Sequence, residues 1–272
     1  MFKIKNILIA ILMVFCLMVE VGCSSASPSP AASSNNSAGA ESAKSNLEKA
    51  VISKNNAELA KNEYTDAIKK YKDAKTDAER DNALSDIKKS KKDLEDNVKS
   101  ADDYATATET AAKDTENDSN GSTDDENRIT EANQNATDAR TVANHAKGYM
   151  ADVNKDYAQI QKDEAKRHTE AYRNAMNDYN DSKKTADEKS AALEKMKAEK
   201  KLVEEAVDAA DLAVKDGEKD TDADKKATQE AADKARDYLK HINDTWDTDK
   251  DEPYDPSQSA IIDFNTWTIP SH

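Results

Sequence analysis

The chain has few of the residues that end, bend or cross-link secondary structure. Its 272 residues include two cysteines, five glycines and five prolines. One cysteine, Cys16, lies within the apolar N-terminal run, so removal of that run leaves no pair of cysteines for an intramolecular disulfide. A sheet-rich fold of this length needs many more turn residues. These scarcities exclude a disulfide-stapled domain and a β-sandwich or barrel, so packing between long helices must hold the fold together.

Long apolar runs are confined to the N-terminus. Lys3 and Lys5 precede an apolar stretch at 7–19, which has the length of a signal-peptide core and is too short for an ordinary membrane span. No comparable run follows it. We therefore predict that residues 1–22 form a signal peptide and that the rest of the chain does not cross a membrane.

Positive charge is in deficit, because the formal net charge is −15. Nucleic-acid binding depends on neutralising phosphates with lysine and arginine, so this balance argues against a nucleic-acid partner. Charged residues make up 35% of the chain and hydrophobic residues 36%. Such a balance occurs both in long helices with polar outer faces and in disordered chains. Periodicity decides between the two.

Two stretches place small or apolar residues at alternating steps of three and four, which is the seam of a helical bundle or coiled coil. The first seam runs through Leu84, Ile87, Lys91, Leu94, Val98, Ala101, Ala105, Thr108 and Ala112, and the second through Ile129, Ala132, Ala136, Ala139, Ala143, Ala146, Met150, Val153, Tyr157 and Ile160. A disordered chain has no reason to keep such a register. Lys91 and Lys200 occupy seam positions, where we expect their stems to lie along the groove with the amines in water.

Helix starts are marked by Thr-x-x-Glu capping boxes at Thr76, Thr123 and Thr185, with a weaker Thr-x-x-Asp case at Thr221. In such a box the threonine oxygen accepts from the third helical N–H, and the glutamate accepts from the N–H of the threonine. Together with the seams they predict five helices, at roughly 42–75, 77–113, 124–181, 186–216 and 222–245. The third is very long, and Gly148 is the point at which we expect it to bend.

One helical hairpin recurs in the sequence. The segment running through Tyr64, Tyr71 and Thr76 resembles the segment running through Tyr172, Tyr179 and Thr185. Beyond the turn the seam positions match as well, with Leu84, Ile87, Leu94 and Val98 falling on Leu193, Met196, Val203 and Val207. A period this long is typical of repeated units that bury each other's faces. We predict a duplicated hairpin with repeat units at about 47–113 and 155–217.

These patterns predict an all-α fold, an elongated antiparallel helical bundle of coiled-coil-like hairpins that covers residues 42–245. Alanine-rich seams let helices approach closely, but each buried alanine removes little area from water, so the core is expected to be slender. Residues 23–41 contain little apolar bulk and are predicted to form a disordered tether. Residues 246–272 are predicted to form a non-helical, aromatic C-terminal tail, because Pro253 and Pro256 end the helical pattern.

Cys23 stands directly after the predicted signal peptide. Together with Val21 and Gly22 it resembles the bacterial lipobox, although Glu20 occupies the position where that motif usually has leucine. The resemblance implies that Cys23 is lipidated, becomes the new N-terminus after cleavage and anchors the chain to the bacterial cell envelope. The outer membrane, with exposure at the cell surface, is the location we expect. The alternative is cleavage after Ala26, which would release a soluble chain without Cys23.

The C-terminal tail contains both tryptophans and the only phenylalanine that follows the signal peptide. Aromatic anchors dominate binding hot spots. The candidate partner-binding residues are therefore Trp246, Tyr254, Ile261, Ile262, Phe264 and Trp267. The alternative is that the tail folds back and plugs the end or a groove of the bundle.

Patterns that would indicate catalysis or metal binding are absent from the sequence. The four histidines lack metal-ligand spacing, and no nucleophile elbow, P-loop or dinucleotide fingerprint occurs. The loop at 116–124 resembles the start of an EF-hand, but Asn127 occupies the position that needs a bidentate glutamate. We expect no enzyme activity, no metal and no cofactor.

In its leader, tether and helical body the chain resembles the helical outer-surface lipoproteins of spirochaetes. This resemblance implies a non-enzymatic surface lipoprotein, held on the membrane by its lipid, that binds an extracellular or host protein. Such proteins act as adhesins, immune-evasion factors or vector-stage antigens. The alternative is a periplasmic spacer lipoprotein between membrane and wall, for which long parallel coiled coils would be expected. The sequence leaves the partner and the oligomeric state open.

Overall fold

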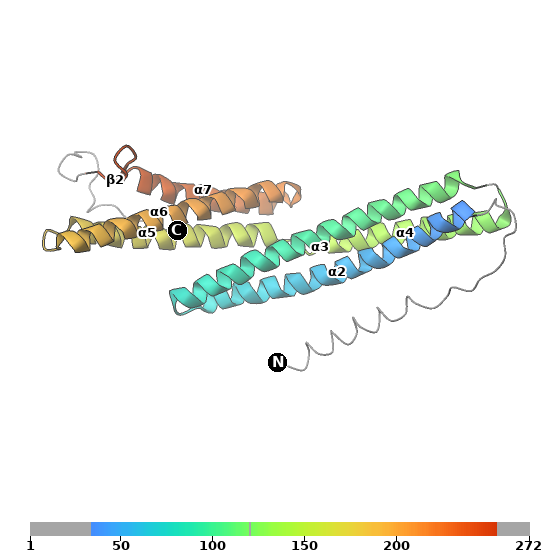
Figure 1. The fold of residues 1–272 in the computed structure, drawn as a ribbon, viewed down its shortest axis with the longest axis horizontal. Helices are drawn as coiled ribbons and strands as arrows, with labels where there is room; N and C mark the ends of the chain where they lie inside the picture. Colours follow the sequence, from blue (N-terminus) through green and yellow to red (C-terminus); the bar gives the residue numbers. More distant parts are fainter. Residues whose placement is uncertain (1–33, 120, 255–272) are drawn as a thin grey trace.

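The computed structural model describes residues 34–119 and 121–254, and most of them are helical (Figure 1). The α-helices are α2 (Ser34–Asp73), α3 (Asp77–Asn117), α4 (Thr123–Gly148), α5 (Val153–Asn180), α6 (Ala186–Asp216) and α7 (Asp222–Asn243). A short 3₁₀ turn, η1 (Gly217–Lys219), follows α6. Two-residue strands β1 (Trp246–Asp247) and β2 (Glu252–Pro253) pair antiparallel. The predicted all-α class is confirmed.

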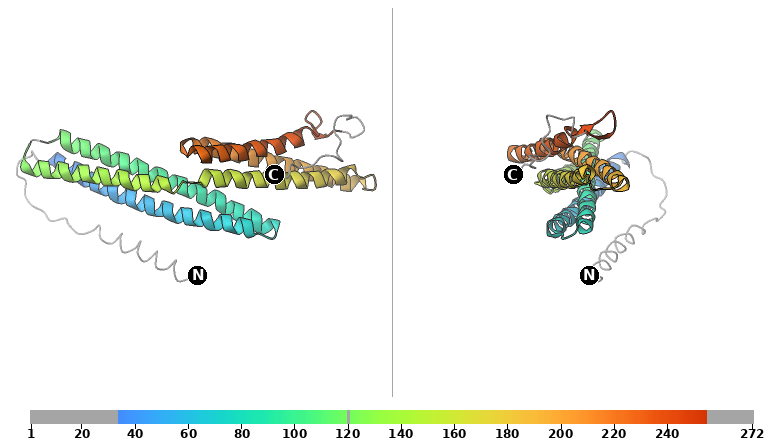
Figure 2. Two further views of the ribbon diagram at one scale, coloured as in Figure 1. Left: turned by 180° about the vertical axis from the view of Figure 1, so that it is seen from behind. Right: turned by 90° about the vertical axis from the view of Figure 1, so that its left-hand side faces the viewer.

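The described helices form two three-helix units along one long axis (Figures 1 and 2). The first unit consists of α2, α3 and α4, and the second of α5, α6 and α7; within each unit all three helices contact one another. In each unit the first two helices form an antiparallel hairpin and the third packs along it. The far end of the α2–α3 hairpin continues past α4 and lies beside the first half of α5, so the two units overlap and the molecule is elongated.

The matched positions of the two hairpins occupy equivalent places in their units. Tyr64 and Tyr172 are both fully buried, as are Ala57 and its match Ala165. Further along, Leu94 of α3 is as completely buried as its match in α6. The third helix of each unit shows no such sequence match, so only the structure reveals that the equivalent unit contains three helices.

The expected capping boxes at Thr76 and Thr185 are present with both of their hydrogen bonds. Thr221 also caps its helix, by accepting from the backbone N–H of Asp224. The box predicted at Thr123 is wrong by one residue. Ser122 is the N-cap there and accepts from the N–H of Asp125, and Thr123 is the first helical residue. Serine caps helices as well as threonine does, so the neighbouring hydroxyl takes over the role.

The single long helix predicted at 124–181 is wrong, because the chain breaks into α4 and α5 at residues 149–152. Asp152 adopts the left-handed conformation with φ 65°, which an α-helix cannot contain. Side chains from α2 satisfy carbonyl groups at the break: the Lys61 Nζ donates to the carbonyl oxygen of Ala151 at 2.9 Å, and the Tyr64 hydroxyl donates to that of Val153 at 3.0 Å. The break therefore joins α5 to the α2–α3 hairpin.

The predicted tether is shorter than expected, because α2 begins at Ser34 instead of residue 42. Its early turns pack against the last turns of α3 and the start of α4: Ala43 is fully buried and clusters with Ala111 and Ala132. The first hairpin is the longer one, since α3 has 41 residues and α6 has 31. The extra turns of α3 give the start of α2 a surface to pack on. The polar composition of residues 34–41 does not by itself predict this contact.

Candidate functional site

Of the residues that the sequence marks as candidates, Trp246 and Tyr254 fall within the described part of the chain. Cys23, Ile261, Ile262, Phe264 and Trp267 lie outside it. The two described residues differ in their surroundings, since Trp246 is 3% exposed and Tyr254 is 42% exposed.

Trp246 closes the core of the second unit. Its ring lies 6.3 Å from the ring of Tyr172, at an interplanar angle of 56°, an arrangement typical of aromatic pairs. Thr245 and the hydroxyl of Tyr172 share a hydrogen bond of 3.0 Å. Trp246 is thus a packing residue in this conformation and presents little of its indole to solvent.

The ribbon formed by β1 and β2 turns the chain back on itself after α7. The N–H of Tyr254 donates to the carbonyl oxygen of Thr245 at 3.1 Å, and Asp251 forms a 2.7 Å ion pair with Lys197 of α6. These contacts hold the ribbon against α6 and leave Tyr254 as an exposed aromatic residue beside the second unit. Two of the candidate tail residues fall within the described chain. Trp246 is buried, so Tyr254 is the one of the two that a partner could contact.

The most unusual chemistry lies where the two units meet, around Glu164 of α5. This carboxylate is 1% exposed. It accepts hydrogen bonds from the Tyr71 hydroxyl at 2.7 Å and from Nη2 of Arg167 at 2.7 Å, and Nε2 of His168 lies 3.5 Å away. Burial by itself would raise the pKa of Glu164, but the hydrogen bonds from His168, Arg167 and Tyr71 outweigh it and lower the pKa to about 2. Glu164 is therefore a buried, ionised group.

Arg167 and His168 connect this carboxylate to both hairpins. Arg167 reaches the start of α3, with ion pairs to Asp77 at 3.3 Å and Asp81 at 2.9 Å. His168 reaches α6, where its Nδ1 lies 2.7 Å from Glu199. Burial would lower the pKa of His168, yet hydrogen bonding to Glu164 and Glu199 raises it. We call these groups, together with Tyr71, the junction network.

Lys91 departs from its predicted environment. Its side chain is buried at 7% exposure, so the amine does not lie in water. The Nζ pairs with Glu95 and, at 3.2 Å, with Asp216 at the end of α6, and it lies 5.3 Å from the centre of the Tyr157 ring. Carboxylates from two helices and an aromatic face replace water around the ammonium, which offsets the cost of burial. Lys91 is thus a second connection between the units.

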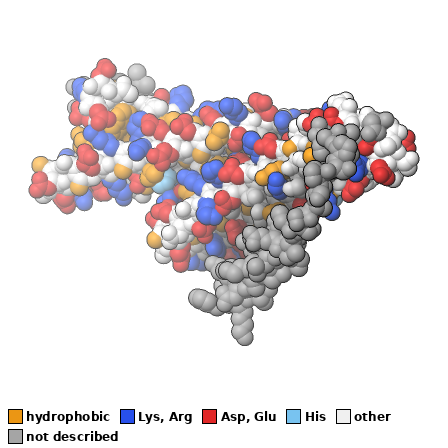
Figure 3. All heavy atoms as spheres, turned by 45° about the vertical axis from the view of Figure 1, so that its right-hand side comes forward, with side chains coloured by type: hydrophobic (Ala, Val, Ile, Leu, Met, Phe, Trp, Pro, Cys, Tyr) orange, Lys and Arg blue, Asp and Glu red, His pale blue; other side chains and the backbone are white. Residues whose placement is uncertain are grey.

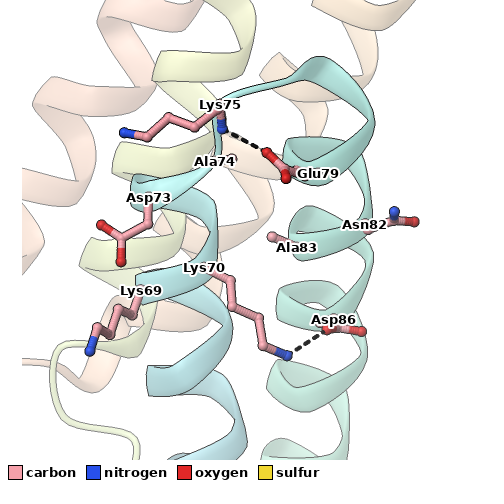
Figure 4. Close-up of a pocket in the computed structure, with 9 residues that line it drawn as sticks. All are labelled: Lys69, Lys70, Asp73, Ala74, Lys75, Glu79, Asn82, Ala83 and Asp86. Atoms are coloured by element: carbon pink, nitrogen blue, oxygen red, sulfur yellow. Dashed lines mark hydrogen bonds and ion pairs between the residues drawn. The ribbon is translucent and has the colours of Figure 1, made fainter.

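A hollow with a volume of about 530 Å³ lies between α2 and α3 near the turn of their hairpin. Figure 4 shows Lys70 reaching across it toward Asp86, at 3.3 Å, and Glu79 accepting from the N–H of Lys75. Three lysines and three carboxylates surround the hollow: Lys69, Lys70, Lys75, Asp73, Glu79 and Asp86. Their opposite charges are interleaved, and Glu79 is already occupied by its capping box. The hollow therefore offers no convergent set of groups for a charged ligand.

Two general properties bear on ligands and membranes. Within residues 34–119 and 121–254, no three His, Cys, Asp or Glu side chains are grouped so that they could hold a metal ion. In the same part of the chain, no helix combines the length and the apolar character needed to cross a bilayer.

Sequence reasoning missed the junction network, although a signal was available. The second seam ends at Val153, Tyr157 and Ile160, and further steps of four and three lead to Glu164 and Arg167. Charged residues at seam positions indicate a buried polar contact, because an isolated charge in a core is costly. The seam does not show which residues pair with Glu164 and Arg167, because the contacting residues of the first hairpin lie roughly ninety residues earlier in the chain.

Comparison with known proteins adds no relatives. No protein-family model, no curated protein and no solved structure matches this chain.

Proposed function

We propose that this protein is a non-enzymatic surface lipoprotein, anchored in the bacterial outer membrane through a lipid on Cys23, that binds an extracellular or host protein. The proposal rests on the sequence order of an apolar leader, a lipobox-like cysteine and a short polar stretch. These residues run directly into α2.

The observation that carries the proposal is the position of the two ends of the described chain. The N-terminal end of α2 lies near one end of the long axis, and β2, which precedes the exposed Tyr254, lies in the half of the molecule toward the other end (Figure 1). An anchor next to α2 would hold the first unit near the membrane and direct the second unit outward. The surface around Tyr254 would then lie in the half of the molecule that is farther from the lipid, where a partner could reach it.

The surface character agrees with such a role. In the view of Figure 3, acidic side chains are interleaved with lysines and arginines, and apolar side chains are scattered between them. With a net charge of −15 the body resists non-specific attachment to nucleic acid and anionic lipid. Binding would depend on a particular local surface instead of bulk charge.

Protease treatment of intact cells of the source organism is the first test of this proposal, with a periplasmic protein as the protected control. Loss of the protein from unbroken cells supports surface display. Protection until the outer membrane is opened would contradict it and favour the periplasmic spacer. Metabolic labelling with a fatty-acid analogue, comparing the native chain with Cys23→Ser, tests the anchor separately.

Partner binding requires a second experiment in which the helical units are kept. Removing residues 246–272 would take Trp246 out of the core, so the chain should be cut after Tyr254. If the tail carries recognition, a chain ending at Tyr254 loses binding to a serum or matrix protein that the full chain binds, while its helix content by circular dichroism is unchanged. Equal binding by both chains would assign recognition to the helical body.

A further inference from the structure

In both units the chain leaves the third helix beside the first tyrosine of the hairpin. In the first unit α4 ends at Gly148, and the Tyr64 hydroxyl donates to the carbonyl oxygen of Val153, the first residue of α5. In the second unit α7 ends at Asn243, and the hydroxyl of the matching Tyr172 shares its hydrogen bond with Thr245. The segment that follows the third helix therefore starts from the same place on each hairpin.

In the first unit that following segment is α5, and it covers the outer half of the hairpin, the half nearer the turn. Tyr157 and Ile160 of α5 belong to one core cluster with Tyr71 and Ile87 of the α2–α3 hairpin. Beyond them, Glu164 reaches the Tyr71 hydroxyl. Since Tyr71 lies in the last turn of α2, the cover extends almost to the end of the hairpin.

The second hairpin carries apolar residues at the same positions of its outer half. Tyr71, Leu84 and Ile87 correspond to Tyr179, Leu193 and Met196. No described helix follows α7, and Figure 1 shows the turn between α5 and α6 extending beyond the end of α7. Tyr179 is only partly buried, whereas its match Tyr71 is buried at 8% exposure. Leu193 and its match Leu84 are both partly buried, and Met196 is as fully buried as Ile87. Within the described chain, Trp246 is the residue beyond α7 that joins this core. The outer half of the α5–α6 hairpin thus carries the same kinds of apolar residue that α5 packs against on the α2–α3 hairpin.

Lys200 gives a second, independent indication. It corresponds to Lys91, and both pair with a glutamate four residues later on the same helix. The Lys91 side chain is 7% exposed because the Tyr157 ring of α5 and Asp216 complete its surroundings. The Lys200 side chain is 19% exposed, and within the described chain no aromatic ring lies over it. An aromatic residue is missing at the position that Tyr157 takes in the first unit.

We propose that residues 255–272 fold back over the outer half of the α5–α6 hairpin, in the place that α5 occupies on the α2–α3 hairpin. In this arrangement the apolar side chains of the tail cover the exposed parts of Tyr179 and Leu193, and an aromatic ring lies near Lys200. The tail residues available for these contacts are Ile261, Ile262, Phe264, Trp267 and Ile269. The inference is independent of the anchor and partner proposed above, and it describes the chain without a partner.

The length of the tail is sufficient for this contact. On the first hairpin, the fifteen residues of α5 from Val153 to Arg167 reach from the Tyr64 hydroxyl to the turn, a helical distance of about 22 Å. The tail has eighteen residues after Tyr254, and an extended chain of that length spans up to about 60 Å. The tail need not be helical to cover the surface, which suits a segment containing Pro256 and Pro270.

Tryptophan fluorescence tests whether the tail is docked at all, in a chain that starts at Ser24 and carries Trp246→Phe. This variant keeps an aromatic ring in the core and leaves Trp267 as the sole tryptophan. A docked tail should give Trp267 an emission maximum shifted to the blue, and acrylamide quenching several-fold weaker than in the free peptide 255–272. Emission and quenching equal to those of the peptide would overturn the proposal.

Disulfide trapping tests where the tail docks, because a chain that starts at Ser24 contains no cysteine. Leu193→Cys is combined in turn with Ile261→Cys, Phe264→Cys or Trp267→Cys. At least one combination should form an intramolecular disulfide readily under mild oxidation. The matched control replaces Leu193→Cys by Leu84→Cys, which occupies the equivalent position on the hairpin already covered by α5, and should stay reduced.

The outcomes separate the possible occupants of the surface. Disulfide formation with Leu84→Cys as readily as with Leu193→Cys, or with neither, would overturn the proposal. A disulfide that links two chains would place the tail of a second copy on the hairpin and would also overturn it. None of these results bears on the lipid or on surface display, so a failure here is distinguishable from a failure of the proposed function.

Discussion

Replacing Glu164 by glutamine should change how the stability of the protein depends on pH. In the folded chain the pKa of Glu164 is lowered from 4.5 to about 2. A lowered carboxyl pKa contributes stability that is fully present above the unfolded value, near 4.5, and is lost as the pH falls through about 2. The native chain should therefore lose this contribution between about pH 5 and pH 2.

The size of the effect follows from the pKa difference. Each unit corresponds to about 1.4 kcal/mol, so Glu164 should contribute about 3 kcal/mol to the free energy of unfolding at neutral pH. Because the Glu164 side chain is almost fully buried, solvent screens its interactions with His168, Arg167 and Tyr71 only weakly. Glu164→Gln should thus be about 3 kcal/mol less stable than the native chain near pH 7, and the difference should shrink toward pH 2.

Urea unfolding followed by circular dichroism at a series of pH values measures this difference directly. Tyr71→Phe removes one hydrogen bond to the charged carboxylate and should cost about 1.5–3 kcal/mol near pH 7. The matched control is Tyr179→Phe, because Tyr179 occupies the equivalent place in the other hairpin and, within the described chain, forms no hydrogen bond to a carboxylate. That change should cost less than about 0.5 kcal/mol.

One result would refute the reasoning. If the difference between the native chain and Glu164→Gln is the same at pH 7 as near pH 2, then Glu164 is not held ionised by its neighbours. The loss of stability would then reflect packing alone, and the junction network would have no electrostatic role.

Four further sets of changes test other parts of the fold by the same unfolding measurements. The pKa of His168 is raised, so its pairing with Glu164 and Glu199 contributes stability that is fully present below about pH 6.5 and is lost as the pH rises through the higher folded pKa. His168→Gln should remove this loss of stability with rising pH. An unchanged pH dependence in the variant would contradict the pairing. Trp246→Ala should cost about 3–5 kcal/mol, because it empties a buried site; a cost below about 1 kcal/mol would show that Trp246 is dispensable for the core. Thr76→Ala should cost about 1 kcal/mol through loss of the helix cap, and no loss would mean that water replaces it. Gly148→Ala should stabilise the fold by up to about 1 kcal/mol, because a methyl group there meets nothing within 4 Å. Gly39→Ala should destabilise it, because its methyl group would run into α3. Equal effects of the two changes would contradict the close approach of α2 to α3 at Gly39.

The helical class and most helix positions could be predicted from the sequence because they depend on local chemistry. Thr76 and Thr185 mark helix starts through contacts three residues away. The seam of α3 is visible because alternating steps of three and four persist for nearly thirty residues. The break at Asp152 could not be predicted in this way, because its driving contacts come from Lys61 and Tyr64 on a distant helix.

The candidate site was less accessible to sequence reasoning. Trp246 is conspicuous in the sequence, but its aromatic side chain is equally suited to a partner and to a core, and the deciding contact with Tyr172 is made across the fold. The seam pattern places Lys91 correctly but predicts a solvated amine, which is wrong because Asp216 reaches the ammonium only through tertiary structure. The junction network depends on pairs of residues from separate units, which no local pattern specifies.

The first unit is longer than the second, and this difference affects whether a further unit could stack onto the end where α2 begins. Two equivalent units stacked end to end offer, in principle, a head-to-tail contact that could be repeated without limit and so produce fibres. Ahead of Val153, the axis of α5 is occupied by α4 of the preceding unit. Ahead of the matching Ser45, the same position is occupied by the first turns of α2 itself, from Ser34 onward. We therefore expect the longer helix to act as a terminal cap that blocks the addition of a further unit at this end.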